Sequence, residues 1–235
     1  MSTPRVLVTG GGRGIGRAIA LRFAREQAKV CVAARTSSEL DAVVIEIGKA
    51  GGQGRAQQMN VADHSSVEGA VWRAVEFLGG AIDVLVNDAG VFDVKPFAEM
   101  DLKVWQRNLE VNLSGPFFVT LEALEPLLDG ERRHVFNIAS VAARKGFAGN
   151  TAYCASKYGL RGFSDALREE LRPKGVRVST VYPGPTDTKL FDGQPGQWDR
   201  AKMNKPEDVA EVVWKAYVAP EGANVDDLEV PPPKG

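Results

Sequence analysis

The sequence has few of the residues that build metal centres and disulfide frameworks. Among its 235 residues are two cysteines, Cys31 and Cys154, and two histidines, His64 and His134. The cysteines fall in an expected strand and an expected helix, which favours two free thiols in a reducing cytoplasm over a disulfide. The histidines lie far apart with no cluster of Cys or His around them, so we expect no metal site.

Long apolar runs and a strong charge bias are also missing. The chain has no run of about 18 apolar residues, so we expect no helix that spans a bilayer and no membrane partner. Its formal net charge of −1 gives no electrostatic reason to expect nucleic acid as a partner. The start of the chain, MSTPRVLVTGGG, has no apolar segment followed by a cleavage site, which argues against secretion.

What is present is an ordinary globular composition in which strand-like and helix-like segments alternate. Hydrophobic residues make up 44% and charged residues 25%, and no repeat or linker divides the sequence, so we expect one domain over residues 1–235. Strands are expected at 5–10, 29–34, 55–60, 81–90, 134–140, 176–184 and 228–230, before a loose tail at 231–235. Helical periodicity covers 14–27, 37–49, 62–80, 101–128, 151–172 and 206–218.

Alternation of this kind is typical of α/β proteins. Strands that are apolar enough to be buried on both faces form a parallel sheet with helices on each side. We therefore expect a doubly wound Rossmann fold with a sheet of about seven parallel strands. Ligands of such folds bind beyond the carboxyl ends of the strands, so candidate site residues are sought directly after each strand.

The segment TGGGRGIG, residues 9–16, joins the first expected strand to the first expected helix. Gly10, Gly14 and Gly16 allow a tight turn, and the helix N-terminus that follows offers free N–H groups and a positive dipole to a phosphate. Because this turn stands between a strand and a helix of an alternating chain, it predicts a dinucleotide-binding site rather than a plain glycine turn.

Five further motifs follow in order along the chain. They are NDAG at 87–90, VNL with Asn112, NIAS with Ser140, YCASK with Tyr153 and Lys157, and PGPTDT at 183–188. Together with the glycine turn they resemble the short-chain dehydrogenase/reductase family over about residues 4–190. The family pattern has asparagine where this chain has Asp88, and we expect the change to affect the hydrogen bonds that support the strand more than contact with the cofactor.

The end of the second expected strand indicates which dinucleotide is bound. An acidic residue there would bond the ribose 2′-OH of NAD and repel the 2′-phosphate of NADP. The chain has Ala34 at this point, followed by Arg35, and Arg13 lies in the glycine turn. Two guanidinium groups suit a dianionic phosphate. We therefore predict NADP(H), although Gly12 replaces the serine of many NADP-binding relatives.

The resemblance implies further contacts with the cofactor. Asn60 stands where the family has an aspartate beside the adenine, and its side chain can accept a hydrogen bond from the adenine amino group, while Val61 packs on the ring. The other implied cofactor residues are Ile15, Asn87, Ala89, Gly90, Tyr153, Lys157, Pro183, Gly184, Thr186 and Thr188.

Tyr153 and Lys157 are spaced i, i+4, which places them on one face of a helix. A tyrosine that exchanges protons near neutrality needs its pKa lowered from about 10 toward 7, which takes about 4 kcal/mol. The Lys157 ammonium and an oxidised nicotinamide have the charge required, so Tyr153 is the expected general acid/base. Ser140 can hold the substrate oxygen, and the resemblance implies that Lys157 also binds the nicotinamide ribose.

The segment VNLSGPFF, residues 111–118, interrupts a long helical pattern. Pro116 lacks the N–H that would bond the carbonyl of Asn112, so the helix is expected to end or bend here. The resemblance implies that this carbonyl holds a water that links the lysine to solvent. Two interpretations stay open: a simple bend, or a bend that frees the Asn112 carbonyl for proton transfer.

The segment 188–204 lies where the family places its substrate loop. Phe191 and Trp198 would cover a small apolar substrate there, and a mobile surface loop is the open alternative. Arg144 and Lys145 precede the tyrosine motif. They would suit an acidic substrate, although a solvated basic pair explains them more simply.

The resemblance favours an NADPH-dependent enzyme that acts on a small ketone, aldehyde or hydroxy acid. A 3-oxoacyl-carrier-protein reductase ranks second, because the chain lacks the longer glycine-rich ending of many such enzymes. A non-catalytic NADP sensor or an interaction module is disfavoured, because Ser140, Tyr153 and Lys157 occur together. The resemblance also implies a homodimer or homotetramer assembled through the helices at 101–128 and 151–172.

Overall fold

The computed structural model describes residues 3–220, 222–223 and 225–233. Its centre is a seven-stranded sheet in the order β3-β2-β1-β4-β5-β6-β7, and all neighbouring strands are parallel. The strands are Arg5–Thr9 (β1), Lys29–Ala34 (β2), Gln53–Gln58 (β3), Val84–Asn87 (β4), His134–Ile138 (β5), Arg177–Pro183 (β6) and Asp227–Val230 (β7). The predicted doubly wound fold is confirmed. Its strand order reverses between β1 and β4, which is where such folds form their ligand crevice.

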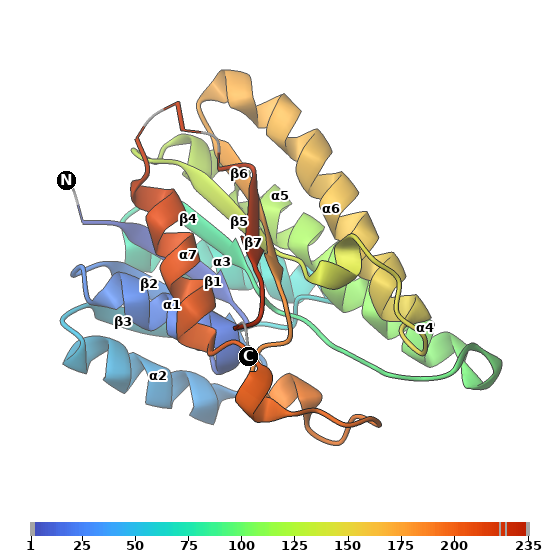
Figure 1. Cartoon of the computed structure of the whole chain (residues 1–235). Coiled ribbons are helices and arrows are strands. Elements are labelled where there is room, and N and C mark those ends of the chain that lie inside the picture. Colours follow the sequence, from blue (N-terminus) through green and yellow to red (C-terminus); the bar gives the residue numbers. More distant parts are fainter. Residues whose placement is uncertain (1–2, 221, 224, 234–235) are drawn as a thin grey trace.

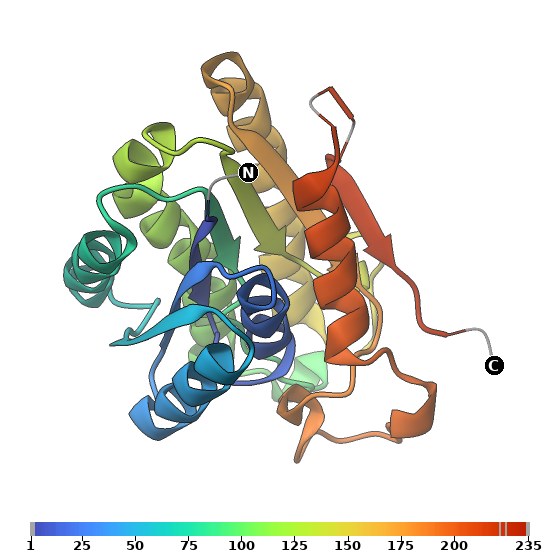
Figure 2. The same ribbon diagram turned by 90° about the vertical axis from the view of Figure 1, so that its left-hand side faces the viewer.

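Helices cover both faces of the sheet (Figures 1 and 2). They are Gly14–Ala24 (α1), Ser37–Lys49 (α2), His64–Leu78 (α3), Leu102–Leu109 (α4), Gly115–Leu128 (α5), Thr151–Leu171 (α6) and Pro206–Val218 (α7). The helices α1, α2 and α7 pack on one face, and α3 and α5 on the other, where α6 also packs against β6. Among the described residues, no helix is long and apolar enough to cross a bilayer.

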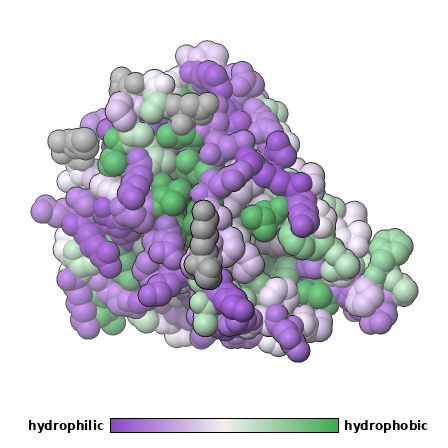
Figure 3. Space-filling view, in the orientation of Figure 1, coloured by the Kyte–Doolittle hydropathy of each residue, from purple (hydrophilic) through white to green (hydrophobic). Residues whose placement is uncertain are grey.

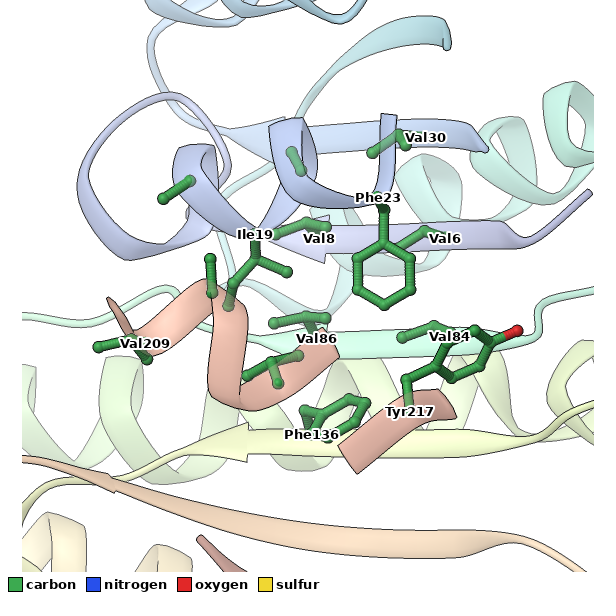
Figure 4. Packing of buried hydrophobic residues seen from close by; sticks show 14 of the residues in the cluster. Val6, Val8, Ile19, Phe23, Val30, Val84, Val86, Phe136, Val209 and Tyr217 are labelled. Atoms are coloured by element: carbon green, nitrogen blue, oxygen red, sulfur yellow. The ribbon is translucent and has the colours of Figure 1, made fainter. Parts of the chain in front are cut away.

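Side chains alternate along each strand, and this divides the core between the two faces. Val6 and Val8 of β1 point toward α1 and α7, where they meet Phe23 and Tyr217 (Figure 4). Leu7, between the two valines, packs on the opposite face with the residues of α3 and α5. Strands buried on both sides in this way are the reason why the sequence shows continuous apolar runs rather than polar alternation.

The ends of α3 follow directly from the sequence. Asp63 accepts hydrogen bonds from the N–H groups of Ser65 and Ser66, at 3.0 and 3.4 Å, and so caps the first turn. At the other end, Gly79 adopts φ +88°, a left-handed conformation that glycine takes without strain. These contacts set the length of a helix that packs behind the site.

The expected interruption of the long helix near Pro116 is confirmed. Between α4 and α5, residues Glu110–Ser114 form a π turn, in which the Gly115 N–H bonds the Glu110 carbonyl five residues earlier. Because Pro116 has no N–H, the ordinary i+4 donor for the Asn112 carbonyl does not exist. The sequence therefore indicated the place of the irregularity, while its form as one widened turn is a finding of the structure.

Other expected boundaries shift by a few residues. The fourth strand is shorter than the predicted 81–90, because residues 88–90 leave the sheet to line the site. In the predicted loose tail, residues 231–233 form neither helix nor strand, and 234–235 lie outside the described residues. Cys31 and Cys154 are both free, as predicted. The prediction of a single domain stays a prediction.

The surface is mainly hydrophilic on the face shown in Figure 3, with apolar groups at the end where residues 90–102 lie. Phe97 and Leu102 in this region are each 76% exposed. Trp105 on α4 and Phe117 and Leu121 on α5 also have exposed side chains. All of these residues except Phe97 belong to the segment 101–128, which the family resemblance assigns to subunit assembly.

Candidate active site

One cavity lies at the carboxyl ends of the central strands, where the strand order reverses. Most of the predicted site residues line it: Gly10, Arg13, Gly14, Ile15, Arg35, Asn60, Val61, Ala89, Gly90, Ser140, Tyr153, Lys157, Pro183, Gly184, Thr186 and Thr188. Three others, Gly16, Asn87 and Asn112, do not line the cavity and support its wall from behind. The cavity thus brings together segments that are up to 188 residues apart, from Gly10 to Trp198.

The glycine turn has the geometry of a phosphate cradle. Gly10 and Gly14 adopt φ +69° and +58°, which L side chains rarely take. A Cβ atom on Gly10 would lie 2.8 Å from the Ala89 nitrogen, so a larger residue does not fit. Arg13 makes no side-chain cap for α1, which leaves the first N–H groups of this helix available to an anion. These residues fit the pyrophosphate of a dinucleotide.

The carboxyl end of β4 is fixed by a buried amide network. The Asn87 Nδ2 donates to Asn137 Oδ1 at 2.8 Å and to Thr120 Oγ1 at 3.1 Å. The Thr9 hydroxyl of β1 accepts from the backbone N–H groups of Asp88 and Ala89, at 3.1 and 3.2 Å. The strand is therefore supported by Asn87 and the backbone, and the expectation that Asp88 disturbs this support is wrong.

The Asp88 side chain faces the glycine turn instead. Burial raises the pKa of its carboxyl to about 7, against the smaller opposing effects of the Lys157 charge and the Gly16 N–H. A Cβ atom on Gly16 would lie 2.7 Å from Asp88 Oδ2, so Gly16 leaves room for this carboxyl. The substitution in the NDAG motif thus places a titratable acid at the base of the site.

The three residues expected to carry the chemistry meet at one end of the cavity. Tyr153 and Lys157 lie on the inner face of α6, and both are buried. Ser140 follows β5, where its hydroxyl accepts from the Ala142 N–H at 3.1 Å and caps a short turn. Lys157 Nζ donates to the Ile138 carbonyl at 2.8 Å, which holds the ammonium against the end of the same strand.

Burial dominates the electrostatics of this group. It raises the pKa of Tyr153 to about 12, although a hydrogen bond with Ser140 lowers it in part. It also lowers the pKa of Lys157 to about 8, although the negative charge of Asp88 opposes this. The expectation that Lys157 lowers the tyrosine pKa is therefore not met by the chain alone. The chain holds the phenol protonated, ready to donate.

Asn112 lies in the π turn and its side chain is fully occupied. Its Oδ1 accepts from the Val91 N–H at 2.8 Å, and its Nδ2 donates to the Val91 carbonyl at 2.9 Å and to Ser156 Oγ at 3.0 Å. The side chain thus clamps the loop after β4 to α6. Pro116 offers no i+4 donor to the main-chain carbonyl of Asn112. The parts of Asn112 and Pro116 in a proton relay both stay predictions.

Aromatic rings form the wall next to the tyrosine. The Phe92 ring lies 4.8 Å from that of Tyr153 and 5.3 Å from that of Phe191, measured between centroids. Phe191 and Trp198 are themselves 4.8 Å apart. The segment 188–204 therefore packs over the catalytic end as an apolar cover. Phe92 was not among the expected site residues; its place two residues after NDAG was the signal for it.

The two basic residues before the tyrosine motif do not line the cavity. Arg144 stacks on the Tyr182 ring at 3.8 Å and pairs with Asp227 and Glu229 of β7. These contacts direct its charge away from the substrate cover, so the suggestion that Arg144 or Lys145 binds an acidic substrate gains no support. The surroundings of the tyrosine are apolar instead.

At the opposite end of the cavity, near the end of β2, the lining residues include the charged side chains of Arg13, Arg35 and Glu39. Arg13 pairs with Glu39 at 3.3 Å, and Arg35 is exposed. Glu39 lies in the first turn of α2, and a Cβ on Gly12 would lie 3.2 Å from its Cβ. Sequence reasoning missed Glu39, although an acid one turn into the helix after β2 was a signal for it.

Comparison with known proteins identifies the family. Residues 4–197 match the family model described as short chain dehydrogenase. The chain belongs to this family. Sepiapterin reductase of Chlorobaculum tepidum is 34% identical over 98% of this chain and 96% of its own. A 3-oxoacyl-[acyl-carrier-protein] reductase of Synechocystis is 35% identical over 94% of each chain.

Solved structures of other short-chain dehydrogenases have the same architecture. An alcohol dehydrogenase from Thermococcus sibiricus, complexed with 5-hydroxy-NADP, superposes with a TM-score of 0.89 at 25% identity and covers 97% of this chain and 96% of its own. A metagenomic short-chain oxidoreductase in complex with NADP gives 0.85 at 31% identity over the whole of both chains. The chain is therefore a short-chain dehydrogenase/reductase, an oxidoreductase of a family that uses NAD or NADP and acts on small molecules.

Proposed function

We propose that this short-chain dehydrogenase transfers hydride between NADP(H) and a small carbonyl or alcohol substrate: it reduces a ketone or aldehyde with NADPH, or oxidises a hydroxy acid with NADP+. The observation that carries the proposal is the meeting of Ser140, Tyr153 and Lys157 at one end of a cavity whose other end is the glycine turn. A cofactor that extends between the two ends would have its nicotinamide beside the tyrosine. Bound NADPH supplies the hydride for this reaction.

The chain's own residues supply the proton and hold the substrate. Tyr153 donates its phenolic proton to the substrate oxygen as the carbonyl carbon is reduced, and the Ser140 hydroxyl holds that oxygen. Lys157 holds the nicotinamide ribose and stabilises the phenolate that remains. The main-chain carbonyl of Asn112 orients the water through which the proton is replaced. In the direction of alcohol oxidation the same phenolate accepts the proton.

The preference for NADP over NAD rests on Arg13 and Arg35, together with the absence of an acid at Ala34. A 2′-phosphate offers these guanidinium groups charge-assisted, bidentate hydrogen bonds. The two solved relatives with NADP or a derivative in their titles support this assignment. Glu39 opposes it in part, because its carboxylate occupies Arg13.

The aromatic cover of Phe92, Phe191 and Trp198 favours a substrate with an apolar group next to its carbonyl. A 3-oxoacyl-carrier-protein reductase is the second candidate. Relatives with that name, from Synechocystis and Aquifex aeolicus, are both 35% identical to this chain. A non-catalytic NADP sensor stays disfavoured, because both Tyr153 and Lys157 are present and buried in the cavity.

Absorbance of NADPH, followed against a panel of ketones, aldehydes, 3-oxo esters and hydroxy acids, tests the activity and separates the two candidates. We expect NADPH to be consumed with a small ketone or aldehyde, and more slowly with NADH. Preference for a 3-oxo ester or a carrier-bound thioester would instead favour the second candidate. A protein that oxidises neither nucleotide with any member of the panel is not a reductase.

We also propose a homodimer or homotetramer in the cytoplasm. The exposed side chains of Leu102, Trp105, Phe117, Leu121 and Tyr158 lie on α4, α5 and α6, and provide apolar surface for assembly. Two free cysteines suit a reducing compartment. Light scattering measures the assembly state, and a monomer at micromolar concentration would contradict the first part of this proposal.

A further inference from the structure

The carboxyl of Asp88 is the one acid placed between the catalytic end and the phosphate end of the cavity, among the residues that the structure describes. It follows β4 directly, and its backbone N–H is held by the Thr9 hydroxyl of β1. The side chain faces the first turn of α1, where Gly16 lies so close that an added Cβ would be 2.7 Å from the Asp88 Oδ2. The backbone therefore fixes where this carboxyl lies.

No ion pair found among the described residues includes Asp88. The titratable groups that face it are Lys157 and Tyr153, both from α6, and α1 contributes the Gly16 N–H and its positive N-terminus. Lys157 Nζ is bonded to the Ile138 carbonyl, so it compensates the carboxylate only through space. Because burial outweighs these favourable effects, the pKa of Asp88 is raised to about 7.

The same helix N-terminus is the place where the proposed function puts the pyrophosphate. A carboxylate at Asp88 and a phosphate would then occupy one end of α1 together. Like charges in one desolvated site disfavour each other's ionised form, so binding of the phosphate raises the pKa of the neighbouring acid further. A neutral asparagine, as in the family pattern, would not have this effect.

We propose that Asp88 takes up a proton when the dinucleotide binds, which makes the affinity for the cofactor depend on pH near neutrality. The inference rests on the proposed function for the position of the pyrophosphate. In the step itself a proton from solvent adds to the carboxylate oxygen, and no other bond changes. Asp88 thus acts on cofactor binding through charge, as a tuning residue that takes no part in hydride transfer.

The direction of the pH dependence follows from linkage. Below about pH 7 the free protein already carries the proton on Asp88, so this residue adds no pH dependence. Above that pH each binding event must take up a proton, and Kd rises by up to about tenfold per pH unit until the pKa of the bound form is reached. The 2′-phosphate of NADPH titrates near pH 6 in the opposite sense, because its dianion is the form that arginines favour.

The test is a series of Kd measurements for NADPH and NADH between about pH 6 and pH 9, on the whole protein and on Asp88→Asn. Asparagine keeps the shape and an acceptor for the Gly16 N–H but cannot titrate. We expect the wild-type Kd to rise about tenfold between pH 7 and pH 8.5 with both nucleotides. The variant Kd should rise clearly less, because Lys157, with a pKa of about 8, then titrates in this range without Asp88. Asp165→Asn, an exposed acid on α6, is the matched control that removes one charge elsewhere and should follow the wild type.

Calorimetric titration of the wild type in buffers of different ionisation enthalpy gives a second measurement that needs no variant. We expect net proton uptake on binding at pH 8. The number should be close to one proton per nucleotide bound, minus any proton that the 2′-phosphate releases. Equal pH slopes for Asp88→Asn and wild type, or binding without proton uptake, would overturn the inference. Failure of both nucleotides to bind at any pH would overturn the proposed function, and tight binding of NADH alone would overturn only the preference for NADP.

Discussion

Two aspartates flank β4, and their opposite environments separate what holds the fold from what serves the site. Asp83, just before the strand, accepts from the Arg5 guanidinium at 2.8 and 2.9 Å and from the backbone N–H groups of Arg5 and Glu131. Burial alone would raise the pKa of Asp83, but these hydrogen bonds hold it below its usual value. Asp88, just after the strand, forms no ion pair among the described residues; the Gly16 N–H and the Lys157 charge lower its pKa only in part, and burial raises that pKa to about 7.

The difference shows that groups at the amino ends of the strands stabilise the fold, whereas groups at the carboxyl ends form the site. At the amino edge, charges are paired and hydrogen bonds are complete, which stabilises the register of β1 and β4. At the carboxyl edge, Tyr153 and Lys157 are buried and Asp88 is half-buried, and the pKa of each is shifted in the direction that disfavours its charged form. Such groups add little to the free energy of unfolding. Ionisable groups with shifted pKa values of this kind are typical of functional sites.

The largest expected effect is on the activity at the carboxyl edge. Tyr153→Phe removes the proton donor and should lower kcat by about 10²- to 10⁴-fold, with an unchanged melting temperature and unchanged NADPH binding. Steady-state turnover, thermal melting and nucleotide titration measure the three quantities. Tyr158→Phe on the exposed side of the same helix is the matched control and should behave as the wild type. Retained turnover in Tyr153→Phe would remove the tyrosine from the mechanism.

The complementary change at the amino edge should affect stability and leave the chemistry intact. Asp83→Asn leaves Arg5 without its charge partner and should lower the free energy of unfolding by about 3 kcal/mol. Because the folded-state pKa of Asp83 is depressed, its contribution is present above about pH 4 and is lost as acid protonates it. Urea unfolding at pH 7 and at pH 3 should therefore show a large difference between variant and wild type that shrinks on acidification. Equal stability at pH 7 would show that the pair is not structural.

Asp88 is expected to behave in the opposite way in the same unfolding experiment. Its raised folded-state pKa favours folding at low pH, and that advantage is lost as pH rises through about 7. Asp88→Asn should therefore be more stable than the wild type at pH 8, by about 1 to 3 kcal/mol after allowance for its partial exposure, and about equal to it at pH 4. A variant that is less stable at pH 8 would mean that the carboxylate is stabilised by the helix N-terminus rather than strained there.

The smallest expected effect concerns the exposed charges at the ribose end of the cavity. Glu39→Gln frees Arg13 from its ion pair and removes a negative charge near the 2′-phosphate. We expect NADPH affinity to rise by about two- to fivefold, because exposed pairs contribute less than about 1 kcal/mol. Glu46→Gln, which breaks the pair with Arg17 on the neighbouring turn, is the control and should have no effect. Weaker NADPH binding in Glu39→Gln would mean that Glu39 positions Arg13.

The sequence was sufficient for the fold and for the meeting of Ser140, Tyr153 and Lys157 in one cavity, while their catalytic roles stay predictions. Alternating apolar runs predict a parallel sheet, and the i, i+4 spacing places Tyr153 and Lys157 on one helical face, because both features depend on local periodicity. Sequence reasoning did not predict that Glu39 pairs with Arg13, or that Phe92 packs on Tyr153. These contacts join segments that the fold brings together, so the local sequence signals each residue but does not indicate its partner.

Asp88 gives a second example of what the sequence alone did not predict. The departure from the family pattern was visible in the sequence, but its consequence depends on which way a side chain leaves the end of β4. The Thr9 hydroxyl satisfies the backbone of Asp88 and so leaves its carboxyl to face the glycine turn. Electrostatic consequences of a substitution thus need the geometry of the neighbours as well as the identity of the residue.

The π turn at Glu110–Ser114 has a consequence for how the chain tolerates length changes. Each residue of a helix turns the chain by about 100° around the helix axis. The one extra residue in the widened turn therefore rotates the side chains of α4 by that angle relative to those of α5. Deleting a single residue here would remove the widened turn and rotate α4 by that angle about its axis relative to α5. Asn108 would then turn away from Asp93, whose carboxylate it now bonds at 3.0 Å. The extra residue therefore keeps both halves of this helix in phase with the loop that covers the site.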